Sequence, residues 1–184
     1  MKIKVIDYEP DWARQFEELS LKLLDIVGDE AISIEHVGST SVVGLAAKPV
    51  IDLDIVVTRE NVSKLISDLE KYGYKHRGNL GLEDREAFSN PEDSTIDHHL
   101  YVCVEGSLAL RNHLFLRDRL RNNPDEMKSY GRLKKELAAK YPDDIDSYVA
   151  AKTQFILNIL EHLDFSESEL SSIREPNMNS KTLQ

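Results

Sequence analysis

The sequence predicts an α+β domain, in which a mixed β-sheet is flanked by helices and followed by a helical C-terminal third. Two patterns predict this class. Short apolar runs typical of strands alternate with amphipathic segments as far as Val104, whereas the pattern is helical from Ser107 onward. The chain has 184 residues, of which 41% are hydrophobic and 30% charged, which is typical of one globular domain with a buried core.

Two helices are predicted in the first half of the chain. The first begins at Pro10, a residue favoured in the first turn, and ends near Gly28. Its apolar residues recur every three or four positions, as on one buried helix face: Trp12, Phe16, Leu19, Leu23 and Ile26. The second helix lies within residues 59–73 and carries the same kind of apolar stripe.

Five segments have the composition of strands: residues 2–6, 33–37, 51–57, 74–78 and 97–104. A short helix is expected between Ser39 and Lys48, where the loop after the second strand meets the third. Residues 78–96 have the composition of a loop. A loop of that length in a compact domain is often functional.

The C-terminal third predicts three helices, in residues 107–123, 125–141 and 144–163, with Pro124 and Pro142 between them. We assign residues 1–164 to a single domain on this pattern. Residues 165–184 are polar, and we expect them to form a flexible tail.

Composition disfavours several classes of function. The formal net charge of −10 disfavours binding to nucleic acid or to an anionic membrane, although a local basic patch can still bind a phosphate. No apolar stretch is long enough to span a membrane, and the N-terminus lacks the apolar segment of a signal peptide. A single cysteine, Cys103, excludes an internal disulfide. We therefore expect a cytoplasmic protein.

Two carboxylates interrupt the apolar strand at residues 51–57. Because side chains alternate along a strand, Asp52 and Asp54 share one face while the branched apolar residues occupy the other. Their Cα atoms are expected to lie about 6.5–7 Å apart, so both side chains can reach one Mg²⁺ or Mn²⁺ ion. The alternative is a structural pair, solvated or bound to Lys48 or an arginine.

A phosphate site is predicted just before this strand. Gly38 and Ser39 lead from a strand into a short helix, where free backbone N–H groups and a hydroxyl favour an anion. Thr40 follows in the same loop and adds a second hydroxyl. A phosphate loop placed shortly before a strand with two carboxylates predicts a nucleoside triphosphate site.

The segment "IEHVGSTSVVGLAAKPVIDLDIVV" resembles the GrpB family of small bacterial proteins, within the nucleotidyltransferase superfamily that includes polymerase beta. The likeness continues through "HHLYV", "LFLRDRLRNNPDEMKSYGRLKKELA" and "YVAAKTQFI", and covers residue 3 to about residue 160. It implies a nucleotidyltransferase-like fold, phosphate contacts from Gly38 and Ser39, and metal binding by Asp52 and Asp54. Two positions depart from the family pattern. Val43 stands where proline is frequent, and Tyr101 replaces the second histidine of a His-Leu-His.

Active members of that superfamily usually add a third acidic residue from a neighbouring strand. Residues 97–104 are the expected neighbour, and no carboxylate occupies the middle of the relevant face. His99 is the candidate there, as a metal ligand or a general base, because its ordinary pKa is suited to proton transfer. The alternative is a hydrogen bond from His99 to a backbone carbonyl or to Glu35. Asp97 is the acidic option, at the edge of the strand.

Basic residues near these segments are further candidates for phosphate binding. Lys48 either neutralises phosphate or pairs with Asp54, and Arg85 in the long loop either reaches a substrate or is solvated. Arg117 and Arg121 either bind phosphate or form an internal network with Asp118, three to four residues apart on one helix face. Two lysines in acidic helices, at positions 134 and 152, are expected on solvated faces, and Cys103 is assigned to packing.

The first function hypothesis is a Mg²⁺-dependent nucleotidyltransferase, in which Asp52, Asp54 and His99 act on a nucleotidyl group passing from a nucleoside triphosphate to a small molecule or a protein. The alternative is a non-catalytic module that binds a nucleotide or a phosphorylated metabolite in the same pocket. The missing third carboxylate favours the alternative, and the aspartate pair favours the enzyme.

Overall fold

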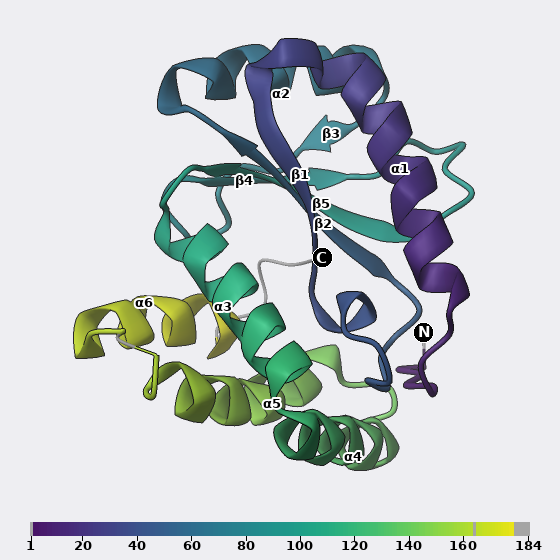
Figure 1. Ribbon diagram of the computed structural model, residues 1–184, viewed down its shortest axis with the longest axis vertical. Coiled ribbons are helices and arrows are strands. Elements are labelled where there is room, and N and C mark those ends of the chain that lie inside the picture. Colours follow the sequence, from purple (N-terminus) through teal and green to yellow (C-terminus); the bar gives the residue numbers. More distant parts are fainter. Residues whose placement is uncertain (1, 164, 179–184) are drawn as a thin grey trace.

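The computed structural model describes residues 2–163 and 165–178, and contains one five-stranded mixed sheet (Figure 1). The strands are β1 (Ala31–Val37), β2 (Ile51–Val57), β3 (Lys75–His76), β4 (Arg85–Ser89) and β5 (His98–Val104), in the spatial order β1-β2-β5-β4-β3. β2 is parallel to β5 and antiparallel to β1, and the pairs β5–β4 and β4–β3 are antiparallel. This is the expected α+β class with a mixed sheet.

Helices cover both faces of the sheet. α1 (Asp11–Val27) and α2 (Val62–Lys71) pack on one face and enclose the main apolar core. α3 (Leu108–Asn122) lies on the opposite face, and α4 (Pro124–Lys140), α5 (Ile145–Leu160) and α6 (Glu167–Met178) form a helical layer beside it (Figure 1). Among the described residues, no helix is long and apolar enough to cross a membrane.

The alternation along β2 decides how the two faces differ. Ile51, Leu53 and Ile55 are fully buried in the core under α1 and α2. The residues between them, Asp52 and Asp54, therefore face the side of the sheet that carries α3, as the sequence predicts. The carboxylates thus point toward the helical layer, where the candidate site lies.

Three local predictions are wrong. The first expected strand makes only an isolated bridge between Ile6 and Ala47. The expected helix after Gly38 is a single 3₁₀ turn, Ser39–Ser41. The expected loop at residues 78–96 contains β4, an internal strand of the sheet, because Ala87 and Phe88 pair with β5 and supply buried side chains despite the polar residues around them.

The tail expected to be flexible contains a helix in the part that the structure describes. Residues 167–178 form α6, because Phe165, Leu170 and Ile173 are buried against Leu157 and Leu160 of α5. Three apolar residues in an otherwise polar segment were too weak a signal to indicate this packing. Residues 179–184 lie outside the described residues, and the single-domain assignment of residues 1–164 stays a prediction.

Candidate functional site

A cavity of about 560 Å³ lies between the sheet and the helical layer. It brings together most of the residues predicted for the site, namely Gly38, Ser39, Thr40, Lys48, Asp52, Arg85, His99 and Arg117. Asp54 and Arg121 are not among its lining residues. Asp97 lines the cavity but precedes β5, so it does not stand in the middle of the strand.

Asp52 is bound by His99. The two residues are register partners on the parallel strands β2 and β5, and His99 Nδ1 donates to Asp52 Oδ1 over 2.8 Å. Burial alone would raise the pKa of Asp52, but this hydrogen bond, with the nearby charge of Lys152, holds it below its ordinary value. His99 therefore binds Asp52, and not Glu35 or a backbone carbonyl as in the alternative; no hydrogen bond of its Nε2 is seen among the described residues.

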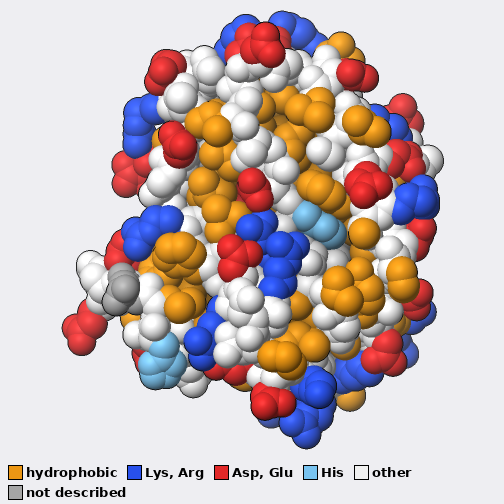
Figure 2. Space-filling model, viewed as in Figure 1, with side chains coloured by type: hydrophobic (Ala, Val, Ile, Leu, Met, Phe, Trp, Pro, Cys, Tyr) orange, Lys and Arg blue, Asp and Glu red, His pale blue; other side chains and the backbone are white. Residues whose placement is uncertain are grey.

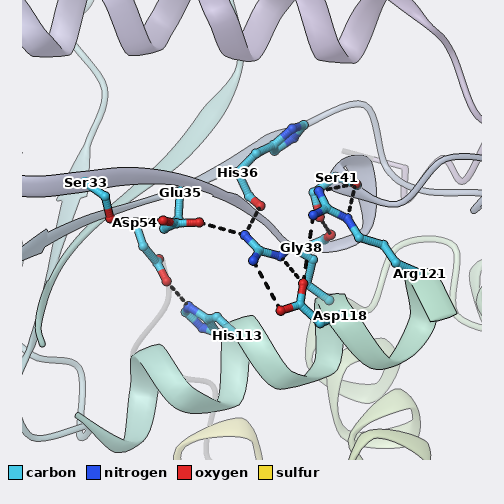
Figure 3. Close-up of polar contacts among 10 residues, drawn as sticks. Ser33, Glu35, His36, Gly38, Ser41, Asp54, His113, Asp118 and Arg121 are labelled. Carbon is cyan, nitrogen blue, oxygen red and sulfur yellow. Dashed lines mark hydrogen bonds and ion pairs between the residues drawn. The ribbon is translucent and has the colours of Figure 1, made fainter. Parts of the chain in front are cut away.

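Asp54 is bound by a second histidine. It is completely buried, and His113 Nδ1 of α3 donates to its Oδ2 over 2.7 Å (Figure 3). Burial would lower the pKa of His113, yet the Asp54 carboxylate raises it above the ordinary value. His113, not Lys48, is therefore the ion-pair partner of Asp54. No group in the described chain donates a hydrogen bond to the other oxygen, Oδ1.

Gly38 is required by its contact with Asp52. Its backbone has a φ of +66° and a ψ of −170°, a conformation almost confined to glycine. A Cβ atom on Gly38 would lie 2.0 Å from Asp52 Oδ2. The glycine therefore admits the carboxylate against the loop, which is a different role from the predicted close approach of a phosphate to its backbone.

Two side-chain contacts hold the loop after β1. The Ser41 hydroxyl donates to Gly38 O over 2.7 Å, and His36 Nε2 lies 3.1 Å from Thr40 Oγ1. Burial lowers the pKa of His36 to about 4, so the ring is neutral and stacks on Phe16. A three-residue turn offers fewer free N–H groups than the predicted helix terminus. Its shape is fixed by these contacts.

Arg117 and Arg121 form the internal network that was the alternative to phosphate binding. Arg117 donates to Glu35 over 2.8 Å and to Asp118 over 2.7 Å, and Arg121 donates to Ser41 O over 2.8 Å (Figure 3). Figure 2 shows such charged side chains gathered where β1 meets α3. The network joins α3 to β1 and to the loop. The charge of Arg117 is neutralised within the protein by Glu35 and Asp118.

Two lysines in the cavity were wrongly assigned to solvated faces. Lys134 of α4 is 2% exposed, its Nζ lies 4.6 Å from the centroid of the Tyr130 ring, and it has no hydrogen-bond partner in the described chain. Burial lowers its pKa well below the ordinary value, and the neighbouring Lys152 lowers it further. For Lys152 of α5, burial and then Lys48 lower the pKa to about 8.

A signal for Lys134 was present in the sequence. Tyr130, Lys134, Leu137 and Ala138 recur at helical spacing, so this lysine lies within the buried stripe of α4 and not opposite it. A lysine in an apolar stripe is expected to point into a cavity or to a partner. The acidic composition of the helix concealed this pattern.

Comparison with known proteins places the chain in a family. A family model described as GrpB protein matches residues 2–162. The chain belongs to the GrpB family. The crystal structure of conserved protein GrpB from Enterococcus faecalis is 35% identical, with a TM-score of 0.76 over 87% of this chain and 99% of that one. UPF0157 protein YqkA of Bacillus subtilis (strain 168) is 38% identical over 84% of this chain, which spans only 45% of YqkA.

The fold extends beyond the family. The structure of Cid1 in complex with its short product ApU has a TM-score of 0.54 over 86% of this chain and 51% of that chain, at 16% identity. At that identity the likeness concerns the fold alone. It confirms the expected nucleotidyltransferase-like fold of this GrpB protein.

The contact between Gly38 and Asp52 generates a stability prediction. Gly38→Ala is expected to cost about 3 kcal/mol of unfolding free energy, because the Cβ atom displaces a carboxylate and strains the backbone. Gly78→Ala is the control, since Gly78 also has a positive φ of +75° but no described atom within 4 Å of the added Cβ. This control should cost only about 1–2 kcal/mol. Equal losses in urea unfolding would show that the Asp52 contact is unimportant.

The pair of His113 and Asp54 predicts a pH-dependent stability. The folded-state pKa of His113 is raised, so its contribution is complete below the unfolded-state pKa and is lost as the pH rises through the folded-state value. His113→Gln keeps a neutral donor, and should destabilise by about 2 kcal/mol at pH 6 and progressively less toward pH 9. The exposed His162→Gln is the control. A pH-independent difference would exclude the charged pair.

Proposed function

We propose that the cavity binds a nucleoside triphosphate with a divalent cation and transfers its nucleotidyl group to an acceptor. The observation that carries this proposal is Lys134, a buried amino group that faces the cavity without a partner in the described structure. Burial favours the neutral amine of Lys134 in the free protein, which is why its pKa is lowered. A bound anion would compensate the charge and let the amino group bind as an ammonium ion.

Two further lysines make this part of the cavity a polyphosphate subsite. Lys48 precedes β2 and Lys152 lies on α5, so three elements each bring one amino group to the same cavity. Lys48 and Lys152 repel each other, as do Lys152 and Lys134. The mutual repulsion favours a ligand with several negative charges, and a triphosphate chain satisfies all three groups.

Asp52 and Asp54 fit a hard divalent cation. Both carboxylates lie on the same face of β2, and Asp54 Oδ1 is a buried acceptor without a donor in the described chain. Mg²⁺ or Mn²⁺ is usually held by one or two carboxylates together with substrate phosphate oxygens. Asp54, Cys103 and His113 also place ligand atoms within 4.8 Å of one another, but the cysteine sulfur does not suit Mg²⁺.

The residues of the chain suit the remaining steps of nucleotidyl transfer. The lysines would bind the triphosphate and stabilise the negative charge that develops on the departing pyrophosphate. His99, oriented by its Nδ1 bond to Asp52, would accept a proton from the acceptor hydroxyl at Nε2. A bound Mg²⁺ would neutralise phosphate charge at Asp52 and Asp54.

One observation favours the non-catalytic alternative. Active members of the superfamily usually add a third acidic residue from a neighbouring strand, but β5, which pairs with β2, has no carboxylate and places His99 opposite Asp52. A module that binds a nucleotide or phosphorylated metabolite requires the lysines and does not require that carboxylate. Release of pyrophosphate from a nucleoside triphosphate, measured in the presence of candidate acceptors, separates the two functions.

Calorimetric titration with Mg²⁺–tripolyphosphate tests the lysine subsite. Lys134→Met should weaken the affinity at least about tenfold, because a charge-assisted contact is lost, without lowering the melting temperature. Lys128→Met, an exposed change on the same helix, is the control. Because the pKa of Lys152 is about 8 in the free protein, binding at pH 8 should take up protons. Unchanged affinity in Lys134→Met would refute the subsite.

A further inference from the structure

We propose that Arg85 forms a second anion subsite, which binds a carboxylate or phosphate group of the acceptor. This inference rests on the proposed function, because it assumes that the lysines bind the triphosphate. Arg85 begins β4, lines the same cavity and is 7% exposed. Its guanidinium carbon lies 4.8 Å from the centroid of the Tyr101 ring.

The charge of Arg85 is uncompensated within the described chain. Its one hydrogen bond runs from Nη2 to the carbonyl oxygen of Asn79 over 3.3 Å, and no described group accepts from Nε. The two acidic residues next to Arg85 in the sequence bind other side chains. Asp84 accepts two bonds from Arg59 at 2.6 Å each, and Glu86 bonds to His76 over 2.6 Å.

A half-buried arginine of the same cavity differs from Arg85 in having carboxylate partners. Arg117, which lines the same cavity, has two carboxylate partners, Glu35 and Asp118. Burying a guanidinium without a carboxylate partner costs folding free energy unless a bound anion accepts its hydrogen bonds. The planar guanidinium can donate two parallel hydrogen bonds to a carboxylate or to a phosphate.

The backbone before β4 is held in a strained form that positions Arg85. Leu80 and Asp84 have positive φ angles of 49° and 61°, which are uncommon for residues other than glycine. The bidentate pair of Arg59 and Asp84 fixes the second of these residues directly beside Arg85. Strained backbone conformations of this kind occur most often at functional sites, where contacts with the surrounding structure maintain them.

The position of Arg85 assigns it to the acceptor and not to the triphosphate. Tyr101, on which the guanidinium lies, is the register partner of Asp54, and its ring centroid is 5.7 Å from that of His113. The charge of Arg85 acts on groups around Asp54, whereas Lys134 and Lys152 act on Asp52. Arg85 is therefore associated with the Asp54 end of the carboxylate pair through Tyr101, and the two lysines with Asp52.

The test titrates inorganic phosphate and, separately, succinate into protein saturated with Mg²⁺–tripolyphosphate. One of these anions should bind, and which one identifies a phosphate-bearing or a carboxylate-bearing acceptor. Arg85→Met should weaken that binding at least about tenfold while the affinity for tripolyphosphate changes less than about twofold. Lys134→Met should show the reverse. Binding of neither anion, or equal binding by Arg85→Met, overturns the proposal.

Stability without ligand gives an independent readout. Arg85→Met should melt at or above the wild-type temperature, because a buried charge without a carboxylate partner is removed. Arg117→Met should melt lower, because Glu35 and Asp118 each lose an ion pair with Arg117. A large loss of stability in Arg85→Met would assign the residue to structure and overturn the subsite. If wild-type protein fails to bind tripolyphosphate, the proposed function fails, and the same phosphate and succinate titrations without it still decide the role of Arg85.

Discussion

Two carboxylates on one face of a buried central strand are the constraint on which the rest of this structure depends. Neither Asp52 nor Asp54 can be ionised there without a compensating charge or hydrogen bond. β5 supplies His99 and α3 supplies His113, each on a separate carboxylate. The first contact lies within the sheet, and the second joins the sheet to α3. The same requirement explains Gly38, whose missing Cβ leaves room for the Asp52 carboxylate.

The cavity has the opposite electrostatic character to the chain as a whole. The formal net charge of −10 repels free anions at long range, yet Lys134 and Arg85 line the cavity without carboxylate partners among the described residues. Such a protein favours an anion that arrives with its own cation, as a nucleotide does with Mg²⁺. Local charge and overall charge both support the ligand that we propose, a metal-bound polyphosphate.

Strand alternation was sufficient to predict the shared face of Asp52 and Asp54, and the apolar stripes were sufficient for α1 to α5. β4 was missed because its few apolar residues lie among Glu86, Asn90 and other polar residues, and because a strand in the interior of a sheet is identified by its partners. α6 was missed because three buried side chains in a polar segment give little periodicity.

Site contacts were harder to predict than elements. The contact of Gly38 with Asp52 depends on how the loop folds back over β2, which no local pattern encodes. His113 and Lys134 come from helices more than fifty residues after Asp54, so their partners depend on tertiary packing. Lys134 was still detectable, because it interrupts an apolar stripe between Tyr130 and Leu137. Charged residues in apolar stripes are therefore worth testing as cavity residues before they are assigned to solvent.

The proposed function requires that Asp52 and Asp54 hold a cation shared with a triphosphate bound by the lysines. The most direct measurement is the calorimetric affinity for a nucleoside triphosphate, with Mg²⁺ and with chelator, in wild type and in the Asp52→Asn/Asp54→Asn variant. We expect Mg²⁺ to tighten binding to wild type at least about tenfold, and the variant to bind equally in both conditions through the lysines. Wild-type binding that is independent of Mg²⁺, or a variant that keeps the full Mg²⁺ effect, would contradict the account.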